Sequence, residues 1–565
     1  MKKTFILGAA IFALLLSSCS GEPAVPVQGV EQSTEETTTA SAAATAVTAI
    51  ATTTEAASAA PPEPVYSDDC KADIERFAIS DENRFIDVPV EYDADVEKGV
   101  LSLSISYDSY VDIYTLQNCI LDISVTEGGY SVEEALNPDG TVDLTKLTKI
   151  ILTDSEGLHR KYDVVTERTV YELPIVNIYL DDTGVNGIDR YEYTPMTFFV
   201  DASGAEEFSS TDPVSGRIRG RGHSTWQWEK KPYRIKLDEG VPVLGLDKDK
   251  DWILLANYSD KSFLRNTVAY SMGRLLDGLD WTPAQYPVDL FVNGEYRGVY
   301  TIGEHMEADD GRVDIDRDST DADTGYLLEV GGVSSAEMWS TYYFHTALDL
   351  AVYIVIQSPG EDVITEEQRS YIEDYLNKAE AAIVSGTGYE EYIDVDSFVD
   401  WIIIHEITYN LDSCFRRSCF MSKDKGGKLK MGPIWDFDLA FGNYDIDSPY
   451  YSDWVTVGYG ATYDEAYVTI NWCNYLMDDP YFRSRLRERW LEVRDRLLEE
   501  AMSCIDYYSE KIYPSQEENF RLWQIWGEKA GLQSDRNLEY ETYELQIQYL
   551  RDFIEMRAEW IDNNV

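Results

Sequence analysis

Three acidic residues could do chemistry together, because the segment between them is expected to fold back on itself. Asp412 follows an apolar run, and Asp436 and Asp438 belong to the later segment WDFD. Between them, residues 419–421 and 429–434 have the composition of two strands around a Lys-Gly-Gly turn, which indicates a β-hairpin. A hairpin returns the chain to the end where it began, so we expect the three carboxylates to lie side by side. One such acid can take the proton of a hydroxyl group while the others hold a divalent metal ion on phosphate.

Paired acids beside aromatic residues can also do no more than cap a loop, and this structural interpretation stays open for Asp436 and Asp438. A glycine- and arginine-rich segment upstream favours chemistry. Segment 215–226 reads SGRIRGRGHSTW and combines three glycines and three arginines with adjacent hydroxyl groups. The backbone N–H groups of such a loop can face phosphate. The candidate phosphate-binding residues of this segment are Arg217, Arg219, Gly220, Arg221, Gly222 and Ser224.

Two further residues are candidates for the same site. Lys236 lies on the strand predicted at 230–237, on the face opposite Ile235 and Leu237, where its ammonium group could reach phosphate. The alternative is a surface lysine on an edge strand. Glu304 follows a hairpin predicted at 288–303 and could pair with Lys236 or help to hold the metal ion. The alternative for Glu304 is an acid in a solvent-facing loop.

Charge restricts the partners of the chain. Its 565 residues carry a formal net charge of −56 with 44% hydrophobic and 13% aromatic residues, which is the composition of an acidic globular protein. Such a field repels nucleic acid and anionic membrane surfaces, so we expect no nucleic-acid partner and a preference for basic partners. A nucleotide could bind only where cations are locally concentrated. The five histidines are scattered, which argues against a histidine-based zinc site.

The first residues have the pattern of an export signal. Two lysines precede an apolar run, and the run ends in Leu-Ser-Ser before Cys19, which resembles a bacterial lipobox. We therefore expect residues 1–18 to be a lipoprotein signal peptide and Cys19 to be lipidated. The protein would then be exported and held on the outer surface of the cell membrane only through this lipid anchor. Residues 19–64, rich in Thr, Ala and Ser, are predicted to be a disordered tether.

The remaining chain divides by pattern into two parts. Residues 65–169 contain short β-branched runs separated by turn residues, which predict a small all-β sandwich as an accessory module. Residues 170–565 form an α+β domain, with strands before about residue 300 and helical spacing later. Helices are predicted at 259–276, 366–384, 395–409, 482–505, 515–530 and 539–563.

Four stretches of the second part together resemble the CotH (spore coat protein H) kinase family. They read RIRGRGHSTWQWEKKPYRIKL, DWILLANYSDKSFLRN, VDLFVNGEYRGVYTIGEHME and MGPIWDFDLAFG, and the resemblance spans roughly residues 171–565. It implies a bilobal, atypical protein-kinase-like domain that uses ATP and Mg²⁺ or Mn²⁺ to phosphorylate Ser or Thr of proteins. It further implies that Asp412 is the catalytic acid, that Asp436 and Asp438 bind the metal, and that Lys236 contacts phosphate.

One position departs from the usual protein-kinase pattern. Protein kinases place a metal-binding Asn five residues after the catalytic Asp, and here that position is Arg417, followed by Ser418. Either another group, such as Ser418 or Asp438, takes the role of the Asn, or activity is weakened or lost.

The function predicted from sequence is a surface-anchored atypical kinase that transfers the ATP γ-phosphoryl group to Ser or Thr hydroxyls of a protein substrate. The net charge suggests basic segments around the target hydroxyl. The alternative is a non-catalytic cell-surface adhesion or carbohydrate-binding lipoprotein on a degenerate kinase scaffold, which the many Trp and Tyr residues would suit. A metal-dependent hydrolase is a third interpretation, but the chain lacks a set of histidines to activate water.

Overall fold

The computed structural model describes residues 66–565, apart from short gaps at 82–85, 106–111, 133, 169–170, 181–183, 223, 332–342, 345–352, 414, 416, 445–450, 458–470 and 532. The predicted signal peptide, the lipidation site at Cys19 and the tether therefore lie outside the described residues. Among the helices that are described, none combines the length and the apolar character needed to cross a bilayer.

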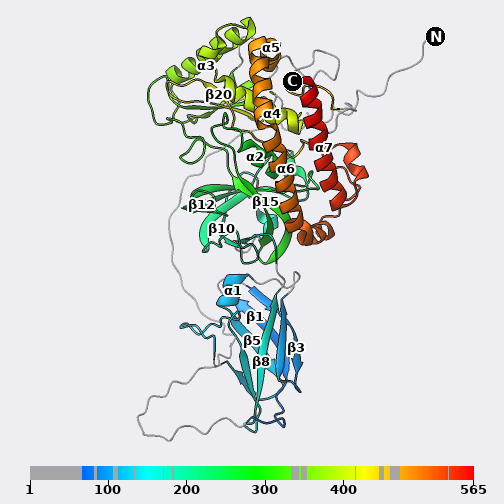
Figure 1. The fold of residues 1–565 in the computed structure, drawn as a ribbon. Helices are drawn as coiled ribbons and strands as arrows, with labels where there is room; N and C mark the ends of the chain where they lie inside the picture. The colour runs from blue at the N-terminus through cyan, green and yellow to red at the C-terminus, as the bar shows by residue number, and fades with distance from the viewer. Residues whose placement is uncertain are drawn as a thin grey trace, which may run out of the picture. The chain divides into compact units, whose positions relative to one another are not determined.

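The first described part consists of two β-sheets that share one core (Figure 1). One sheet has the order β2-β1-β5 and the other the order β3-β4-β8-β7-β6. Their bounds are β1 (Ile74–Asp81), β2 (Ile86–Pro89), β3 (Glu91–Asp95), β4 (Val100–Ile105), β5 (Ile120–Val125), β6 (Gly129–Ser131), β7 (Lys149–Thr153) and β8 (His159–Arg168), with the short helix α1 (Ile113–Gln117) before β5. Phe77 and Leu121 from one sheet and Leu103 and Tyr162 from the other are buried in the shared core. The alternating runs thus form the strands of two sheets whose buried side chains belong to one core.

Seven strands of the next part close into a barrel in the order β10-β11-β12-β13-β15-β14-β9. They are β9 (Ile175–Leu180), β10 (Thr194–Asp201), β11 (Val214–Gly220), β12 (Tyr233–Val241), β13 (Asp249–Leu255), β14 (Gln285–Val292) and β15 (Glu295–Glu304). All neighbouring strands are antiparallel except β9 and β14, which are parallel. Ile218, Ile235, Trp252 and Ile302 fill the core. Alternation predicted the strands, but closure depends on the long-range β9–β14 pair, which local pattern does not reveal.

Another sheet follows the barrel, with the strand order β17-β18-β16-β19-β20. Its strands are β16 (Tyr326–Gly331), β17 (Tyr343–Phe344), β18 (Tyr353–Ser358), β19 (Cys419–Lys423) and β20 (Leu429–Met431). Six described α-helices follow β13 in the chain, and α2 comes before β14 while the others come after β18. They are α2 (Arg265–Gly273), α3 (Glu366–Ser385), α4 (Val395–Thr408), α5 (Trp472–Asp478), α6 (Pro480–Leu522) and α7 (Tyr543–Asn564). Every residue of α4 from Ser397 to Thr408 is buried, so α4 is the central helix. The mixed α+β architecture is confirmed.

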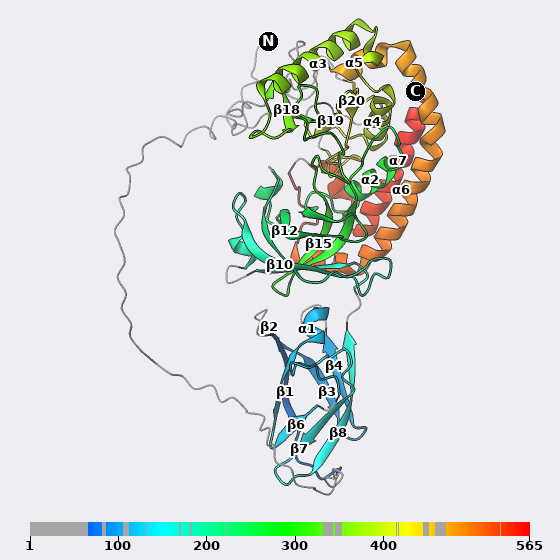
Figure 2. The same cartoon turned by 90° about the vertical axis from the view of Figure 1, so that its left-hand side faces the viewer.

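Helix α6 differs from its prediction. The two helices expected at 482–505 and 515–530 are one continuous helix of 43 residues, with Pro514 inside it. Proline usually ends or kinks a helix, but here a contact next to the proline ties the helix to the barrel. Ser515, the next residue, donates to Asp289 of β14 at 2.6 Å. In Figure 2, α6 passes from the helices around α5 down to the barrel near β15, so it connects the two halves.

A buried ion pair fixes α7 against α4. Arg557 on α7 pairs with Glu406 on α4 at 3.2 Å, and both side chains are almost completely buried. Glu406 also accepts the backbone N–H groups of Val455 and Thr456 at 2.9 and 2.7 Å. Because the carboxylate is fully bonded, the loss of Arg557 would leave it charged and uncompensated in the core.

We therefore expect Arg557→Met to lower the free energy of unfolding by about 3–5 kcal/mol. Arg551→Met, on the same helix, removes a partly exposed pair with Asp506 and is the control, with an expected loss below about 1 kcal/mol. Chemical unfolding of the two variants measures both values. Equal losses would show that the buried pair does not stabilise the packing of α7.

Candidate functional site

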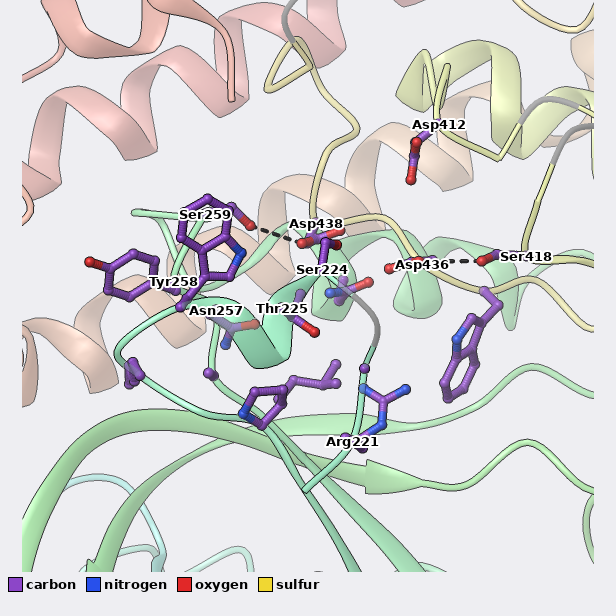
Figure 3. A pocket seen from close by; sticks show the side chains of 18 of the residues that line it. Arg221, Ser224, Thr225, Asn257, Tyr258, Ser259, Asp412, Ser418, Asp436 and Asp438 are labelled. Carbon is purple, nitrogen blue, oxygen red and sulfur yellow. Dashed lines mark hydrogen bonds between the residues drawn. The ribbon is translucent and has the colours of Figure 1, made fainter. Parts of the chain in front are cut away.

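A cavity of about 270 Å³ lies where the loops after β11 and β13 meet the segments on either side of the β19–β20 hairpin. Six residues predicted from sequence line it: Asp412, Asp436, Asp438, Arg221, Gly222 and Ser224. Figure 3 shows several of these side chains from close by. The other lining residues are Thr225, Trp228, Lys230, Pro232, Leu255, Ala256, Asn257, Tyr258, Ser259, Asn266, Arg417, Ser418 and Trp435.

The predicted hairpin is confirmed and brings the acids together. Strands β19 and β20 are antiparallel, with Met421 opposite Met431. Asp412 lies in the loop between the end of α4 and β19, and its side chain is largely buried, with 7% of the residue exposed. Asp436 and Asp438 come after β20. Segments separated by more than twenty residues therefore place three carboxylates on one cavity.

The backbone at Asp436 is strained and tightly held. Its φ angle is +68°, a left-handed conformation that side chains other than Gly seldom adopt. The N–H of Asp436 donates to the Tyr270 hydroxyl at 3.1 Å, and Asn410 Nδ2 donates to the carbonyl of Asp436 at 2.9 Å. Phe437 N–H donates to Asn266 Oδ1 at 2.8 Å. A strained backbone conformation that several hydrogen bonds hold in place is often found at functional sites. It directs a side chain to a position that an unstrained conformation would not reach.

Asp436 and Asp438 form a crowded acidic pair. The Ser259 hydroxyl donates to Asp438 at 2.9 Å, and the Ser418 hydroxyl donates to Asp436 at 3.3 Å (Figure 3). Burial, followed by the charge of Asp436, raises the pKa of Asp438 well above its ordinary value. Burial and the charge of Asp412 likewise raise the pKa of Asp436, although nearby Arg221 opposes that shift. The pair is arranged to receive a cation.

Two cationic side chains meet the cavity from the barrel side. The guanidinium of Arg221 lies 6.0 Å from the centre of the Trp435 ring and near enough to Asp436 for the two charges to interact. Lys230 is buried, with 2% exposed, and its ammonium group donates to Asn519 Oδ1 at 2.8 Å. Burial lowers the pKa of Lys230 well below its ordinary value. Arg221, whose guanidinium keeps its proton in proteins, provides local positive charge that an anionic ligand needs in so acidic a chain.

The structure places the remaining predicted residues outside this cavity. Arg217 and Arg219 both lie 5.2 Å over the ring of Tyr193. Lys236 faces away from the barrel core and pairs with Asp251 at 3.1 Å. Their roles in phosphate binding stay predictions.

Two other predicted residues have structural surroundings. Gly220 lies against Trp226, whose ring leaves no room for a Cβ atom. Glu304 is buried and accepts the N–H of Ala284 at 2.8 Å, and Asp251, rather than Glu304, is the ion-pair partner of Lys236. A part for Glu304 in metal binding stays a prediction.

Sequence reasoning missed Lys230 and Ser259. Lys230 belongs to a Lys-Lys-Pro segment just before β12, and spacing alone cannot distinguish a buried lysine from an exposed one. Ser259 was expected to begin or cap a helix, but α2 starts only at Arg265 and the preceding loop faces the cavity. The stretch of small and polar residues from Asn257 was the available signal.

The acidic pair fits a divalent metal ion that shares its coordination with a phosphate ligand. Within the described ranges, no three His, Cys, Asp or Glu side chains form a metal site made of protein alone. Mg²⁺ is usually held by one or two carboxylates together with phosphate oxygens and water. Asp436 and Asp438, with the Ser418 hydroxyl beside them, provide that oxygen donor set.

A second cavity, of about 430 Å³, adjoins the first, and Arg221 and Trp435 line both. Its other lining residues are Arg234, His305, Met306, Glu307, Ala308, Leu327, Glu329, Gln357, Ser358 and Phe420. Burial lowers the pKa of His305 to about 3, so this imidazole is neutral at physiological pH. Burial raises the pKa of Glu307 to about 7. Met306, Leu327 and Phe420 give this cavity an apolar part that suits an uncharged ring, beside the charged side chains of Arg234 and Glu329.

Neutralising Asp438 should stabilise the metal-free protein, because it removes a buried charge that Asp436 repels. We expect Asp438→Asn to raise the free energy of unfolding at neutral pH by about 1–2 kcal/mol. The folded-state pKa of Asp438 lies above its unfolded value, so wild-type stability falls as pH rises through the folded pKa. The advantage of the variant should therefore shrink as pH is lowered toward the ordinary aspartate value of 3.8.

The control for this prediction is Asp495→Asn on α6, where the side chain is 89% exposed and a change in stability of less than about 0.5 kcal/mol is expected. Thermal unfolding in a chelating buffer across the pH range measures both variants. Destabilisation by Asp438→Asn would mean that the carboxylate supports the fold and is not held in place for a ligand.

Comparison with known proteins identifies the family of the chain. A family model described as CotH kinase protein matches residues 218–561, a range that contains every residue of the first cavity. No curated protein matches the chain. Since the matched range is more than half of the sequence, the chain belongs to the CotH kinase family.

Proposed function

We propose that the protein is an ATP- and metal-dependent phosphotransferase of the protein serine/threonine kinase type. The observation that carries the proposal is the convergence of Asp412, Asp436 and Asp438 on one cavity that also contains Arg221. Phosphoryl transfer needs cations and positioning more than covalent help from the protein. The barrel and the helical half, with the cavity between them, would correspond to the two lobes of a kinase-like domain.

The nucleotide would lie across both cavities. Met306, Leu327 and Phe420 offer apolar contact for the adenine ring in the second cavity. Arg221, which lines both cavities, would meet the phosphates as they enter the first. Asp436 and Asp438 would hold Mg²⁺ or Mn²⁺, which when bound neutralises charge on the phosphate oxygens.

Asp412 would act on the acceptor. Its carboxylate orients the Ser or Thr hydroxyl and takes its proton as the acceptor oxygen bonds to the γ-phosphorus. The bond between that phosphorus and the oxygen bridging to the β-phosphate breaks at the same time, and ADP leaves. Asp412 lies on a different segment from the metal-binding pair, so it can approach the acceptor while Asp436 and Asp438 hold the metal.

The acceptor and the location follow from charge and from the N-terminal pattern. A net charge of −56 favours protein substrates whose target hydroxyl lies among basic residues, and it disfavours nucleic acid. A lipid on Cys19 would hold the protein at the outer surface of a bacterial membrane as its only membrane contact.

The test is transfer of labelled phosphate from ATP, with Mg²⁺ or Mn²⁺, to a basic Ser-rich peptide. We expect Asp412→Asn to lower kcat about 10²–10⁴-fold while nucleotide affinity stays within about threefold, because a general base acts on the acceptor. Asp436→Asn should instead abolish the metal-dependent part of nucleotide binding. Asp495→Asn, which is exposed on α6, is the control and should keep full activity.

A thermal-shift titration separates this proposal from its rival. Stabilisation that requires both ATP and metal supports a kinase. If neither ligand alone nor both together change the melting temperature, the proposal fails and a non-catalytic surface module on a kinase scaffold is favoured. Unchanged turnover in Asp412→Asn would show that Asp412 is not the base.

A further inference from the structure

The loop that carries Asp412 also presents an arginine to the cavity. Arg417 is 49% exposed at its side chain, lines the cavity, and places its Nε atom 3.8 Å from Asp412 Oδ1. Ser418, the next residue, donates to Asp436. Arg417 therefore contacts Asp412, the proposed base, and is the sequence neighbour of Ser418, which contacts the metal-binding pair.

The local backbone fixes this placement. Phe415 and Ser418 have φ angles of +46° and +52°, both in the left-handed region. Phe415 is buried against Trp401 and Trp472, with ring centres 6.4 and 5.3 Å away. The aromatic anchor holds the base of the loop, and the strained conformation at Ser418 turns its hydroxyl to Asp436.

Arg417 occupies the position at which protein kinases place a metal-binding Asn. A guanidinium has five N–H donors and no acceptor, so it cannot ligate a metal ion. It carries a fixed positive charge and matches phosphate oxygens in a two-pronged geometry. In its pair with Asp412 the arginine side chain is half exposed, the aspartate is largely buried, and the N–O distance of 3.8 Å is long for an ion pair.

We propose that Arg417 supplies the second cation of the phosphoryl-transfer site in place of a second metal ion. The site then works with one divalent ion, held by Asp436 and Asp438, and with Arg417 on the γ-phosphate. This inference rests on the proposed function. It agrees with the finding that, in the described part of the chain, no three His, Cys, Asp or Glu side chains are placed to hold a metal ion by themselves, since a two-metal site needs more protein ligands than Asp436 and Asp438 provide.

The first measurement is the number of Mn²⁺ ions bound per full chain, by titration calorimetry, in the presence of an ATP analogue with a non-hydrolysable β–γ bridge. We expect one ion in the wild-type protein and two in Arg417→Asn, which restores the amide ligand. Two ions in the wild-type protein, or one in Arg417→Asn, would overturn the inference. If the analogue does not bind with any metal, the proposed function itself fails.

The second measurement compares nucleotides with and without a γ-phosphate. Arg417→Ala should weaken binding of the analogue about 10–100-fold and binding of ADP by less than about threefold, because only the analogue offers the group that Arg417 contacts. Arg417→Lys keeps the charge but loses the two-pronged fit, so its affinity for the analogue should lie between those of the wild-type protein and Arg417→Ala. Arg485→Ala, on α6 outside the cavity, is the control.

Two outcomes of the second measurement decide against the role of Arg417. Equal losses for ADP and the analogue would place Arg417 elsewhere on the nucleotide. Unchanged affinity for both would show that Arg417 only neutralises Asp412. Unchanged melting temperatures confirm that each variant is folded. Because wild-type nucleotide binding is measured in the same series, failure of the Arg417 inference is distinguished from failure of the proposed function.

Discussion

Asp436 and Asp438 lie side by side and partly buried, and burial raises the pKa of both carboxyls, helped by the charge of Asp412 at Asp436 and by the charge of Asp436 at Asp438. Two like charges in a low-dielectric cavity lower the stability of the fold unless a cation joins them. The protein meets this cost with fixed backbone contacts around the pair. Tyr270 and Asn266 on α2 bond the N–H groups of Asp436 and Phe437. The pair is thus preorganised, and the free energy needed to assemble it is supplied by folding and not by the ligand.

The net charge of the chain also constrains where positive charge is needed. In a chain of net charge −56, an anionic nucleotide is attracted only where cations outnumber acids locally. Lys230 lies buried at the wall of the cavity, and Asn519 on α6 accepts a hydrogen bond from its amine while also accepting the N–H of Val299 on β15 at 3.1 Å. One amide oxygen on the long helix therefore ties the barrel, the helical half and a cavity-lining lysine together. A break in α6 at Pro514 would move Asn519 and with it these contacts.

The parts of the site that follow from local chemistry were predictable from sequence. The β19–β20 hairpin follows from its Lys-Gly-Gly turn and flanking apolar residues, so the positions of Asp412, Asp436 and Asp438 followed as well. The surroundings of the Lys236 side chain depend on the residue opposite it on the neighbouring strand β13. That residue is Asp251, which forms an ion pair with Lys236. Lys230, Ser259 and the closed barrel depend on contacts between residues far apart in sequence, which periodicity does not encode. The helix through Pro514 is a case in which tertiary contacts override a local signal.

The arrangement of charge also gives the site an order of events. Before ligands bind, Arg417 lies beside Asp412, and Arg221 interacts with Asp436, so each functional acid has an arginine within reach. Under the proposed function, both guanidinium groups could move to a phosphate, which offers more oxygens in the geometry that a guanidinium matches. Entry of a triphosphate would therefore draw the arginines away from the acids and leave the acids to the metal ion and to the acceptor hydroxyl. A cavity that keeps its acids partly neutralised until the nucleotide arrives exposes its reactive charge only when the reaction can proceed.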